Sequence, residues 1–314
     1  MTRHFQILVS ENMPSNLPAN TLIINEFSKI QNLLGQEFET ILFDARKGIH
    51  LEALAIAAGT LKMNGALIIL LSNWEKLHSQ IDEDSLRWSG SIEAIATPRF
   101  MTYFKHCIHK YGFPILYHQN DLKFGCTSQQ LFVNHNATLD QQKIIEQILQ
   151  KESELYFLTA KRGRGKSALA GLLANQLDTK IYLTAPNKSA VKILAEFSQK
   201  EIIFIAPDEL FLALQNDPSF SENAWLFVDE AAMLPIAQLS AFSHHFKYIL
   251  FTTTIHSYEG TGRGFELKFK QKINRTFSDF ELIEPLRWSK DDVLEAFIDE
   301  LLLLNVEDDF KQTP

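Results

Sequence analysis

The stretch LYFLTAKRGRGKS, residues 155–167, determines how the second half of this chain is interpreted. Four apolar residues at 155–158 predict a buried strand, and the run 168–176 predicts a helix. A strand, a glycine-containing loop ending in Gly-Lys-Ser and a helix form the arrangement of a nucleotide phosphate-binding loop. We therefore expect Lys166 to neutralise phosphate charge and the Ser167 hydroxyl to hold Mg²⁺.

The loop departs from the strict motif at one position. The pattern G-x-x-x-x-G-K-[S/T] requires a glycine five residues before Gly165, and this chain has Ala160 there. Gly163, inside the loop, is expected to supply the missing flexibility. An ordinary strand–turn–helix with a chance Gly-Lys-Ser is the alternative interpretation of this stretch alone.

The run WLFVDE, residues 225–230, predicts the second half of a nucleotide site. Four apolar residues before two acids indicate a buried parallel strand that presents Asp229 at its carboxyl end. Asp229 is expected to bind Mg²⁺, and Glu230 to orient or deprotonate an attacking water molecule. Lys166, Asp229 and Glu230 are thus the candidate catalytic residues. A solvated acidic turn is the alternative, but it explains poorly an acidic pair that follows a phosphate loop.

The hydrophobic pattern predicts an α/β fold with parallel sheets. We expect an N-terminal α/β domain at 1–130, a P-loop ATPase domain at 131–290, and an acidic helix and tail at 291–314. Expected strands are 5–9, 22–24, 41–43, 66–71, 115–117, 155–158, 180–184, 202–205, 225–228 and 248–252; expected helices are 51–61, 100–110, 168–176, 188–198, 209–215, 237–245, 291–305 and one that begins after the N-cap Thr138 and ends at 149.

Two further strand ends carry polar residues. The run Thr252-Thr253-Thr254 ends an expected strand, where ATPases often place a polar sensor, although threonine also simply favours strands. The turn Asp44-Ala45-Arg46 follows an expected strand of the first domain and could be a site, but we favour a surface turn, in a domain that serves as a scaffold or binding unit.

Charge is distributed unevenly along the chain. The net charge is −8, but residues 290–314 hold two Lys or Arg against eight Asp or Glu, so the rest of the chain is nearly neutral. The segment RGFELKFKQKINR, residues 263–275, holds five basic residues and one acid. Such a segment could contact RNA phosphates and bases, and a solvated amphipathic segment is an equal alternative. The candidate RNA contacts are Arg263, Lys268, Lys270, Lys272 and Arg275.

Composition favours a cytoplasmic protein without a membrane anchor. The longest apolar runs, such as 66–71, are too short to span a bilayer, and the N-terminus lacks the apolar core of a signal peptide. The two cysteines, Cys107 and Cys126, have no metal-ligand spacing and are expected to be free thiols. The ten histidines form no metal pattern either.

Four motifs in sequence, TAKRGRGKSALAG, LFVDEAAMLP, TTTIHSYEGTGRGF and EPLRW, resemble the bacterial tRNA(Met) cytidine acetyltransferase family. The resemblance implies an N-terminal α/β domain, a helicase-like ATPase domain of the RecA/RecD type, an acetyltransferase domain and a tRNA-binding tail. It further implies that ATP hydrolysis and acetyl-CoA are used to place an N4-acetyl group on the wobble cytidine of elongator tRNA(Met).

The resemblance also assigns nucleotide-binding residues by position. The phosphate-binding loop corresponds to Gly163, Arg164, Gly165, Lys166, Ser167, Ala168 and Leu169. Gln141 or Gln142 corresponds to the nucleotide-contacting glutamine, and the pair leaves the register open. Asp229 and Glu230 match the acidic pair, and Arg287 matches an ATP-binding arginine. Residues 257–264 match a family loop to which we assign no role.

One departure from the family pattern is large. The acetyltransferase domain is expected shortly after EPLRW, but 27 residues follow Arg287, so we expect the ATP-binding and hydrolysing part only, with no acetyl-CoA site. A fragment, a split gene product and a shortened paralogue would each account for this. The leucine run 301–304 suggests a helix that meets more protein, such as a separate acetyltransferase chain. Two functional alternatives stay open: a standalone RNA-dependent NTPase or helicase, and a non-hydrolysing ATP-binding subunit.

Overall fold

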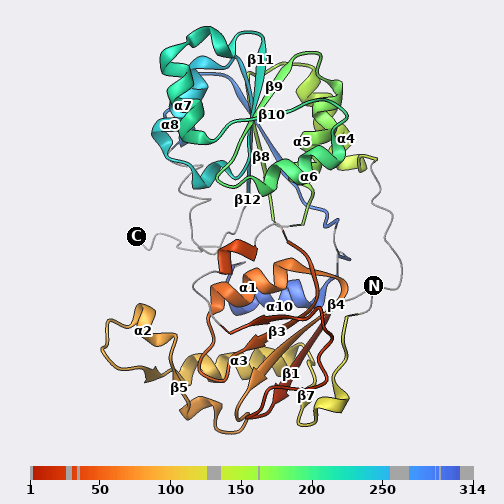
Figure 1. Ribbon diagram of the computed structural model, residues 1–314, viewed down its shortest axis with the longest axis vertical. Coiled ribbons are helices and arrows are strands. Elements are labelled where there is room, and N and C mark those ends of the chain that lie inside the picture. Colours follow the sequence, from red (N-terminus) through yellow and green to blue (C-terminus); the bar gives the residue numbers. More distant parts are fainter. Residues whose placement is uncertain are drawn as a thin grey trace, which may run out of the picture. The chain divides into compact units, whose positions relative to one another are not determined.

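The computed structural model describes residues 3–25, 30–33, 36–125, 136–161, 163–254, 269–286, 288–289 and 291–304. The chain forms two compact units, of which the first combines Met1–Gln130 with Arg287–Pro314 and the second is Leu131–Leu286. Each unit is built on a parallel sheet with helices (Figure 1), which confirms the predicted α/β class.

The first unit contains a five-stranded parallel sheet in the order β2-β3-β4-β1-β7. A small antiparallel pair, β5-β6, stands apart from it. The elements are β1 (His4–Val9), β2 (Leu22–Ile24), β3 (Phe38–Asp44), β4 (Leu61–Leu71), β5 (Ile81–Asp82), β6 (Ile95–Ala96), β7 (Ile115–Leu116), α1 (Leu51–Thr60), α2 (Ser85–Trp88), α3 (Pro98–Lys110), α10 (Val293–Leu301), and the short 3-10 turns η1 (Ile30–Leu33), η2 (Leu77–Ser79) and η3 (Gln119–Asp121).

Helix α10 completes the core of the first unit, because it packs between α1 and α3 (Figure 1). The ring of Phe297 lies with its centroid 5.0 Å from that of Phe5 in β1 and 5.1 Å from that of Phe113. Phe297 is fully buried, so the apolar face of this amphipathic helix is satisfied here.

A buried ion pair fixes the start of α10 to the start of β1. Arg3 and Asp292 form a bidentate pair, with distances of 2.6 Å from Nη2 to Oδ1 and 3.1 Å from Nε to Oδ2, and each side chain is 1% exposed. The Arg3 guanidinium carbon lies 3.8 Å from the centre of the Trp288 ring. The expected separate helix and tail at 291–314 is therefore corrected: its helix belongs to the first unit, and residues 305–314 lie outside the described residues.

The second unit contains a six-stranded parallel sheet in the order β10-β9-β11-β12-β8-β13. Its elements are α4 (Leu139–Leu149), β8 (Leu155–Ala160), α5 (Lys166–Gln176), β9 (Lys180–Thr184), α6 (Ser189–Phe197), β10 (Ile203–Phe204), α7 (Pro207–Asn216), β11 (Ala224–Val228), α8 (Ile236–His245), β12 (Tyr248–Thr254), β13 (Phe277–Leu282), and the 3-10 turns η4 (Pro218–Ser221) and η5 (Ala231–Met233).

Helices cover both faces of this second sheet (Figure 1). Side chains of α4, α5 and α6 pack on one face, and side chains of α7 and α8 pack on the other. Burial from both sides explains why residues 155–158 of β8 and the whole of β11 are apolar rather than alternating. The sheet thereby holds the carboxyl ends of β8, β11 and β12 side by side at one edge.

Sequence patterning located most elements of both sheets. The expected strands at 22–24 and 180–184 have the predicted bounds, and Thr138 is the N-cap of α4 as expected. The elements that were not predicted include β13, which is paired with β8, and the short helix α2 with the strands β5 and β6 that flank it.

Candidate functional site

The candidate site lies at the carboxyl edge of the second sheet. The loop after β8 leads into α5, the acidic pair follows β11, and β12 runs between these two strands. Because all three strands are parallel, their ends bring Lys166, Glu230 and Thr254 into contact although they are distant in sequence.

Two left-handed glycines shape the loop after β8. Gly163 has φ of +74° and Gly165 has φ of +82°. A Cβ atom on Gly165 would lie 2.4 Å from Leu286 Cδ1 and 2.8 Å from Gln141 Nε2, so this position requires glycine. Ala160 is the last residue of β8, paired with Thr254, and its extended conformation does not need glycine. The backbone turn demanded by the motif is thus supplied by Gly163 and Gly165.

Helix α5 begins at Lys166 with Gly165 as its N-cap, and no side chain caps its first N–H groups. Free N–H groups at a helix N-terminus, preceded by left-handed backbone, form a concave surface suited to an anion. Ser167 on the first turn is half-buried, whereas Ala168 and Leu169 are buried in the core under the helix. Ala168 can therefore offer a ligand only its backbone, and the Leu169 N–H already donates to the Gly165 carbonyl at 2.9 Å.

Lys166 is buried and points to the ends of the neighbouring strands. Its Nζ donates a hydrogen bond to Thr254 Oγ1 at 2.9 Å and lies 3.8 Å from Glu230 Oε1. The Thr254 hydroxyl in turn donates to Glu230 Oε1 at 2.6 Å, and the Thr254 N–H donates to Glu230 Oε2 at 3.2 Å. Lysine, threonine and glutamate therefore form one connected polar group.

Asp229 is held by a second threonine of the same strand. Thr252 donates its hydroxyl hydrogen bond to Asp229 Oδ1, and the Asp229 N–H donates to the Thr184 carbonyl at 2.9 Å. Burial, followed by the nearby Glu230 carboxylate, raises the pKa of Asp229. An acid in this environment is stabilised in its ionised form by a cation.

The three threonines of the predicted sensor run, 252–254, differ in their contacts. Thr252 and Thr254 contact the two acids, while Thr253 Oγ1 is buried and has no hydrogen-bond partner among the described residues. The alternation along β12 explains this, because successive side chains of a strand point to opposite faces.

Glu230 has a backbone that sequence inspection does not anticipate. Its φ of +49° and ψ of +48° place it in the left-handed region, which is uncommon for a residue with a long side chain. The left-handed turn ends β11 sharply and returns the carboxylate to β12, where Thr254 binds both of its oxygens.

The segment after β13 contacts the phosphate loop through hydrogen bonds made by its own backbone groups. The Leu286 N–H donates to the Gly163 carbonyl at 2.8 Å, and Arg164 Nε donates to the Ile283 carbonyl at 3.0 Å. Arg164 is thus a buried brace of the loop in this structure. Sequence reasoning did not identify Leu286 and Ile283 as contacts of the loop, because these hydrogen bonds use their backbone groups.

The two candidate glutamines differ in position. Gln141 is buried, closes the capping box of α4 with Thr138, and donates from Nε2 to the Gly165 carbonyl at 3.1 Å. Gln142 is exposed on α4. Gln141 is therefore the one in contact with the loop. Arg287 lies outside the described residues, as does the loop 257–264.

The candidate RNA contacts have varied surroundings. Lys270 pairs with Asp279 at 2.6 Å and its Nζ lies 4.8 Å from the centre of the Phe157 ring. Arg275 binds Glu154 at 2.9 Å and the Phe246 carbonyl at 2.8 Å, and it also donates to the carbonyls of Ser243 and Lys247 at the end of α8.

Lys272 is exposed, whereas Arg263 and Lys268 lie outside the described residues. Arg275 thus compensates the carbonyl end of α8, and Lys272 is the most accessible of the three described candidates.

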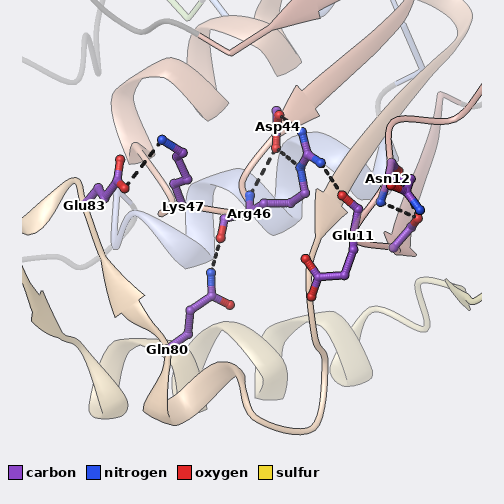
Figure 2. Close-up of polar contacts among 8 residues, drawn as sticks. Glu11, Asn12, Asp44, Arg46, Lys47, Gln80 and Glu83 are labelled. Atoms are coloured by element: carbon purple, nitrogen blue, oxygen red, sulfur yellow. Dashed lines mark hydrogen bonds and ion pairs between the residues drawn. The ribbon is translucent and has the colours of Figure 1, made fainter.

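The Asp44–Arg46 turn of the first unit is an internally paired structure (Figure 2). Arg46 donates to both Asp44 oxygens, at 2.9 and 2.7 Å, and to the Glu11 carbonyl. Burial raises the pKa of Asp44, but the hydrogen bonds from Arg46 outweigh it and the pKa is lowered overall. Lys47 faces Glu83 at 3.7 Å. These contacts support the interpretation as a turn that is held by its own ion pair and by neighbouring residues of the first unit.

Within the described ranges, no group of three or more His, Cys, Asp or Glu residues could hold a metal ion. In the same residues, no helix combines the length and the apolar character needed to cross a membrane. Cys107 is buried in α3, and Cys126 lies outside the described residues.

Comparison with known proteins identifies both units. Residues 5–119 match the model of the N-terminal domain of tRNA(Met) cytidine acetyltransferase TmcA, and residues 157–305 match that of the helicase domain of RNA cytidine acetyltransferase NAT10/TcmA. The helicase match agrees with the P-loop-like fold of the second unit.

Individual relatives are much longer than this chain. The tRNA(Met) cytidine acetyltransferase TmcA of Haemophilus influenzae is 61% identical over 314 residues, which cover 99% of this chain and 48% of the relative. TmcA of Haemophilus ducreyi is 39% identical over 308 residues, which cover 96% and 51%. The UvsW helicase structure from bacteriophage T4 is similar over 63% of this chain and 86% of its own, at 10% identity and a TM-score of 0.36, too low to support an argument. The chain spans about half the length of the curated relatives it matches.

Proposed function

Since this chain belongs to the TmcA family, of which it matches the N-terminal and helicase parts, we propose that its second unit binds and hydrolyses ATP to serve the acetylation of a tRNA cytidine. The single observation that carries the proposal is the polar group Lys166–Thr254–Glu230 beside the open N-terminus of α5. A phosphate cradle and a positioned carboxylate at the same sheet edge are the requirements of an ATPase.

The phosphates are proposed to lie against the N–H groups of the loop from Gly163 to Ala168, with Leu169 closing the first turn of α5 behind them. Lys166 would exchange its present oxygen partners for phosphate oxygens, since a buried ammonium binds most strongly to a full negative charge. Gln141 holds the Gly165 carbonyl and so fixes the loop beneath the nucleotide. Gln142 and Arg287 are proposed as further nucleotide contacts, from the family resemblance alone.

An Mg²⁺ ion fits the oxygen donors that this edge offers. Mg²⁺ prefers hard oxygen ligands, and the proposed pair is the Ser167 hydroxyl and the Asp229 carboxylate. The raised pKa of the buried Asp229 is consistent with a site that is completed by a cation, and Thr252 orients its carboxylate. When bound, the metal would neutralise phosphate charge.

Glu230 is proposed to orient the attacking water and to accept its proton. Its side chain is 37% exposed and its carboxylate accepts two hydrogen bonds from Thr254, so it has access to solvent and a preferred direction. Proton acceptance from water requires such a positioned carboxylate. Asp229 is too deeply buried to share this role.

The RNA side of the reaction is proposed from the family. The relatives are named tRNA(Met) cytidine acetyltransferases, so elongator tRNA(Met) is the proposed RNA partner and the cytoplasm the proposed location. Lys272 is a proposed contact for RNA phosphates, together with Arg263, Lys268, Lys270 and Arg275. Acetyl-CoA binding is proposed for the half of the relatives that this chain does not cover, and a separate acetyltransferase chain that carries that half is a proposed partner.

A direct test is titration of the purified chain with a fluorescent ATP analogue in the presence of Mg²⁺. Lys166→Ala should weaken binding about 10-fold or more, because a charge-assisted contact to phosphate is lost. Lys192→Ala, which removes an exposed lysine of α6, is the matched control and should bind like the unaltered chain. Equal affinity in the two variants would contradict the proposed site.

A further inference from the structure

The hydroxyl of Thr254 is the shared oxygen between the phosphate-loop lysine and the acidic pair. It lies at the last residue of β12, is 5% exposed, and is 2.9 Å from Lys166 Nζ and 2.6 Å from Glu230 Oε1. A hydroxyl has one proton and two acceptor lone pairs. The Thr254 hydroxyl donates its proton in a hydrogen bond to Glu230 and accepts a hydrogen bond from Lys166 with one of its lone pairs.

Glu230 depends on Thr254 for its direction. Its left-handed backbone is unfavourable for a residue that carries a side chain, and this conformation persists only where neighbours fix it. Thr254 supplies two such contacts, one from Oγ1 and one from its own N–H, and they reach different oxygens of the carboxylate. Without the hydroxyl, the carboxylate keeps only one of its two contacts with Thr254, the one from the backbone N–H.

Lys166 contacts both Thr254 and Glu230, and it is also the lysine expected to bind phosphate at the loop. Its ammonium is now shared between the Thr254 hydroxyl and the Glu230 carboxylate. An arriving phosphate, with more negative charge than a hydroxyl, would draw the ammonium away from both. The Thr254 hydroxyl then retains its bond to Glu230, so the carboxylate stays in place when its ion-pair partner leaves.

We propose that Thr254 is a positioning residue that keeps the Glu230 carboxylate aimed for water activation while Lys166 moves from Glu230 to the phosphates of the nucleotide. The proposal rests on the ATPase function proposed above. It assigns Thr254 a role in turnover and a minor role in affinity, because the phosphates themselves bind Lys166 and the loop. If Thr254 had only a structural role in β12, its replacement would not lower turnover while leaving ATP affinity unchanged.

The strand offers a matched control for the test. Thr253 is the preceding residue, is 3% exposed, and its hydroxyl has no partner among the described residues. Thr253→Val therefore makes the same chemical change one position away, on the opposite face of β12. Thr254→Ser restores the hydroxyl without the methyl group and tests whether the oxygen is what matters.

The experiment measures ATP affinity and steady-state turnover for the unaltered chain, Thr254→Val, Thr254→Ser and Thr253→Val, with thermal unfolding to verify folding. Thr254→Val should lower kcat about 10-fold or more and change the dissociation constant of ATP less than about threefold. Thr254→Ser should recover at least about a third of the turnover, and Thr253→Val should match the unaltered chain.

The possible failures are distinguishable. If the unaltered chain turns over ATP and Thr254→Val matches Thr253→Val, the role of Thr254 is overturned and the ATPase function stands. Equal loss of affinity and turnover in Thr254→Val would make Thr254 a binding residue and would also overturn the proposal. If the unaltered chain fails to turn over ATP, the ATPase function fails, and the role of Thr254 fails with it. If Thr254→Val does not fold, full turnover in Thr254→Ser supports the positioning role, and loss of turnover in folded Thr254→Ser contradicts it.

Discussion

Lys166 Nζ and Glu230 Oε1 lie 3.8 Å apart, so the proposed phosphate ligand and the proposed water-activating carboxylate form a loose ion pair. The pair connects the start of α5, which follows the loop after β8, with the end of β11, and strand β12 lies between β8 and β11. Each charge partly offsets the other, and nucleotide phosphates would compete with the carboxylate for the ammonium.

Glu230→Gln is predicted to separate binding from turnover. The amide keeps the shape and one of the two oxygens that accept from Thr254, but it removes the competing charge and the proton acceptor. ATP affinity should be maintained or increased, while kcat should fall about 100-fold. Glu222→Gln, at an exposed acid of the same unit, should leave both quantities unchanged. Turnover in Glu230→Gln close to that of the control would rule out the proposed role.

Gly165→Ala is predicted to disrupt the phosphate loop. The added Cβ would be forced against Leu286 and Gln141 in addition to the strain of a φ of +82°. Gly112→Ala is the comparison, because φ there is +67° and nothing lies within 4 Å of the added atom. Gly112→Ala should cost about 1–2 kcal/mol of unfolding free energy and leave ATP affinity intact.

The measurement for the two glycine variants is ATP titration beside thermal unfolding. Gly165→Ala should lose ATP affinity by about 10-fold or more, a larger effect than backbone strain alone would give. If Gly165→Ala bound ATP as well as Gly112→Ala does, the loop geometry described here would not be the geometry that binds nucleotide.

Arg3→Ala is predicted to destabilise the first unit through α10. Removal of one partner of a buried ion pair leaves Asp292 uncompensated, at a cost of about 3–5 kcal/mol. Lys47→Ala breaks an exposed pair with Glu83 in the same unit and should cost at most about 1 kcal/mol. Both variants keep the nucleotide loop unchanged in sequence.

Alkylation of Cys107 provides a local measurement for the Arg3 variant. The thiol is buried in α3 beside α10, and burial raises its pKa, so less reactive thiolate is present in the folded chain. Iodoacetamide should therefore label Cys107 slowly in the unaltered chain and in Lys47→Ala, and much faster in Arg3→Ala. Unchanged labelling in Arg3→Ala would show that α10 does not depend on this pair.

Lys272→Ala and Arg275→Ala are predicted to act on different properties. Arg275 binds Glu154 and the last carbonyls of α8, so its loss should lower the unfolding free energy by about 1.5–3 kcal/mol. Lys272 is exposed, so its loss should weaken tRNA binding at low salt without a change in stability. Thermal unfolding and tRNA filter binding, performed side by side, check both. A stability loss in Lys272→Ala would remove it from the RNA candidates.

Sequence patterning predicted the nucleotide edge because motif and topology coincide there. An apolar strand before Gly-Lys-Ser and another before Asp-Glu must both be buried and parallel, so their ends meet. Strand β13 was missed because it lies at the sheet edge, where Phe277 and Glu281 are exposed and the pattern lacks the continuous apolar run of β8.

Two features had no sequence signal that could reveal them. The pairing of Arg3 with Asp292 joins residues near opposite ends of the chain, and neither residue type nor spacing encodes that contact. The left-handed backbone of Glu230 occurs at a residue with a long side chain, whereas sequence rules reserve such backbone for glycine, asparagine and aspartate. Both are consequences of tertiary packing.

The most direct test of the central claim is the steady-state ATPase rate of the chain with and without elongator tRNA(Met), beside Lys166→Ala and Lys192→Ala. We predict that the chain and Lys192→Ala hydrolyse ATP, that the tRNA raises the rate, and that Lys166→Ala abolishes it. ATP bound without turnover under any RNA would contradict the account and favour a nucleotide-binding subunit, and turnover that persists in Lys166→Ala would place hydrolysis outside the site described.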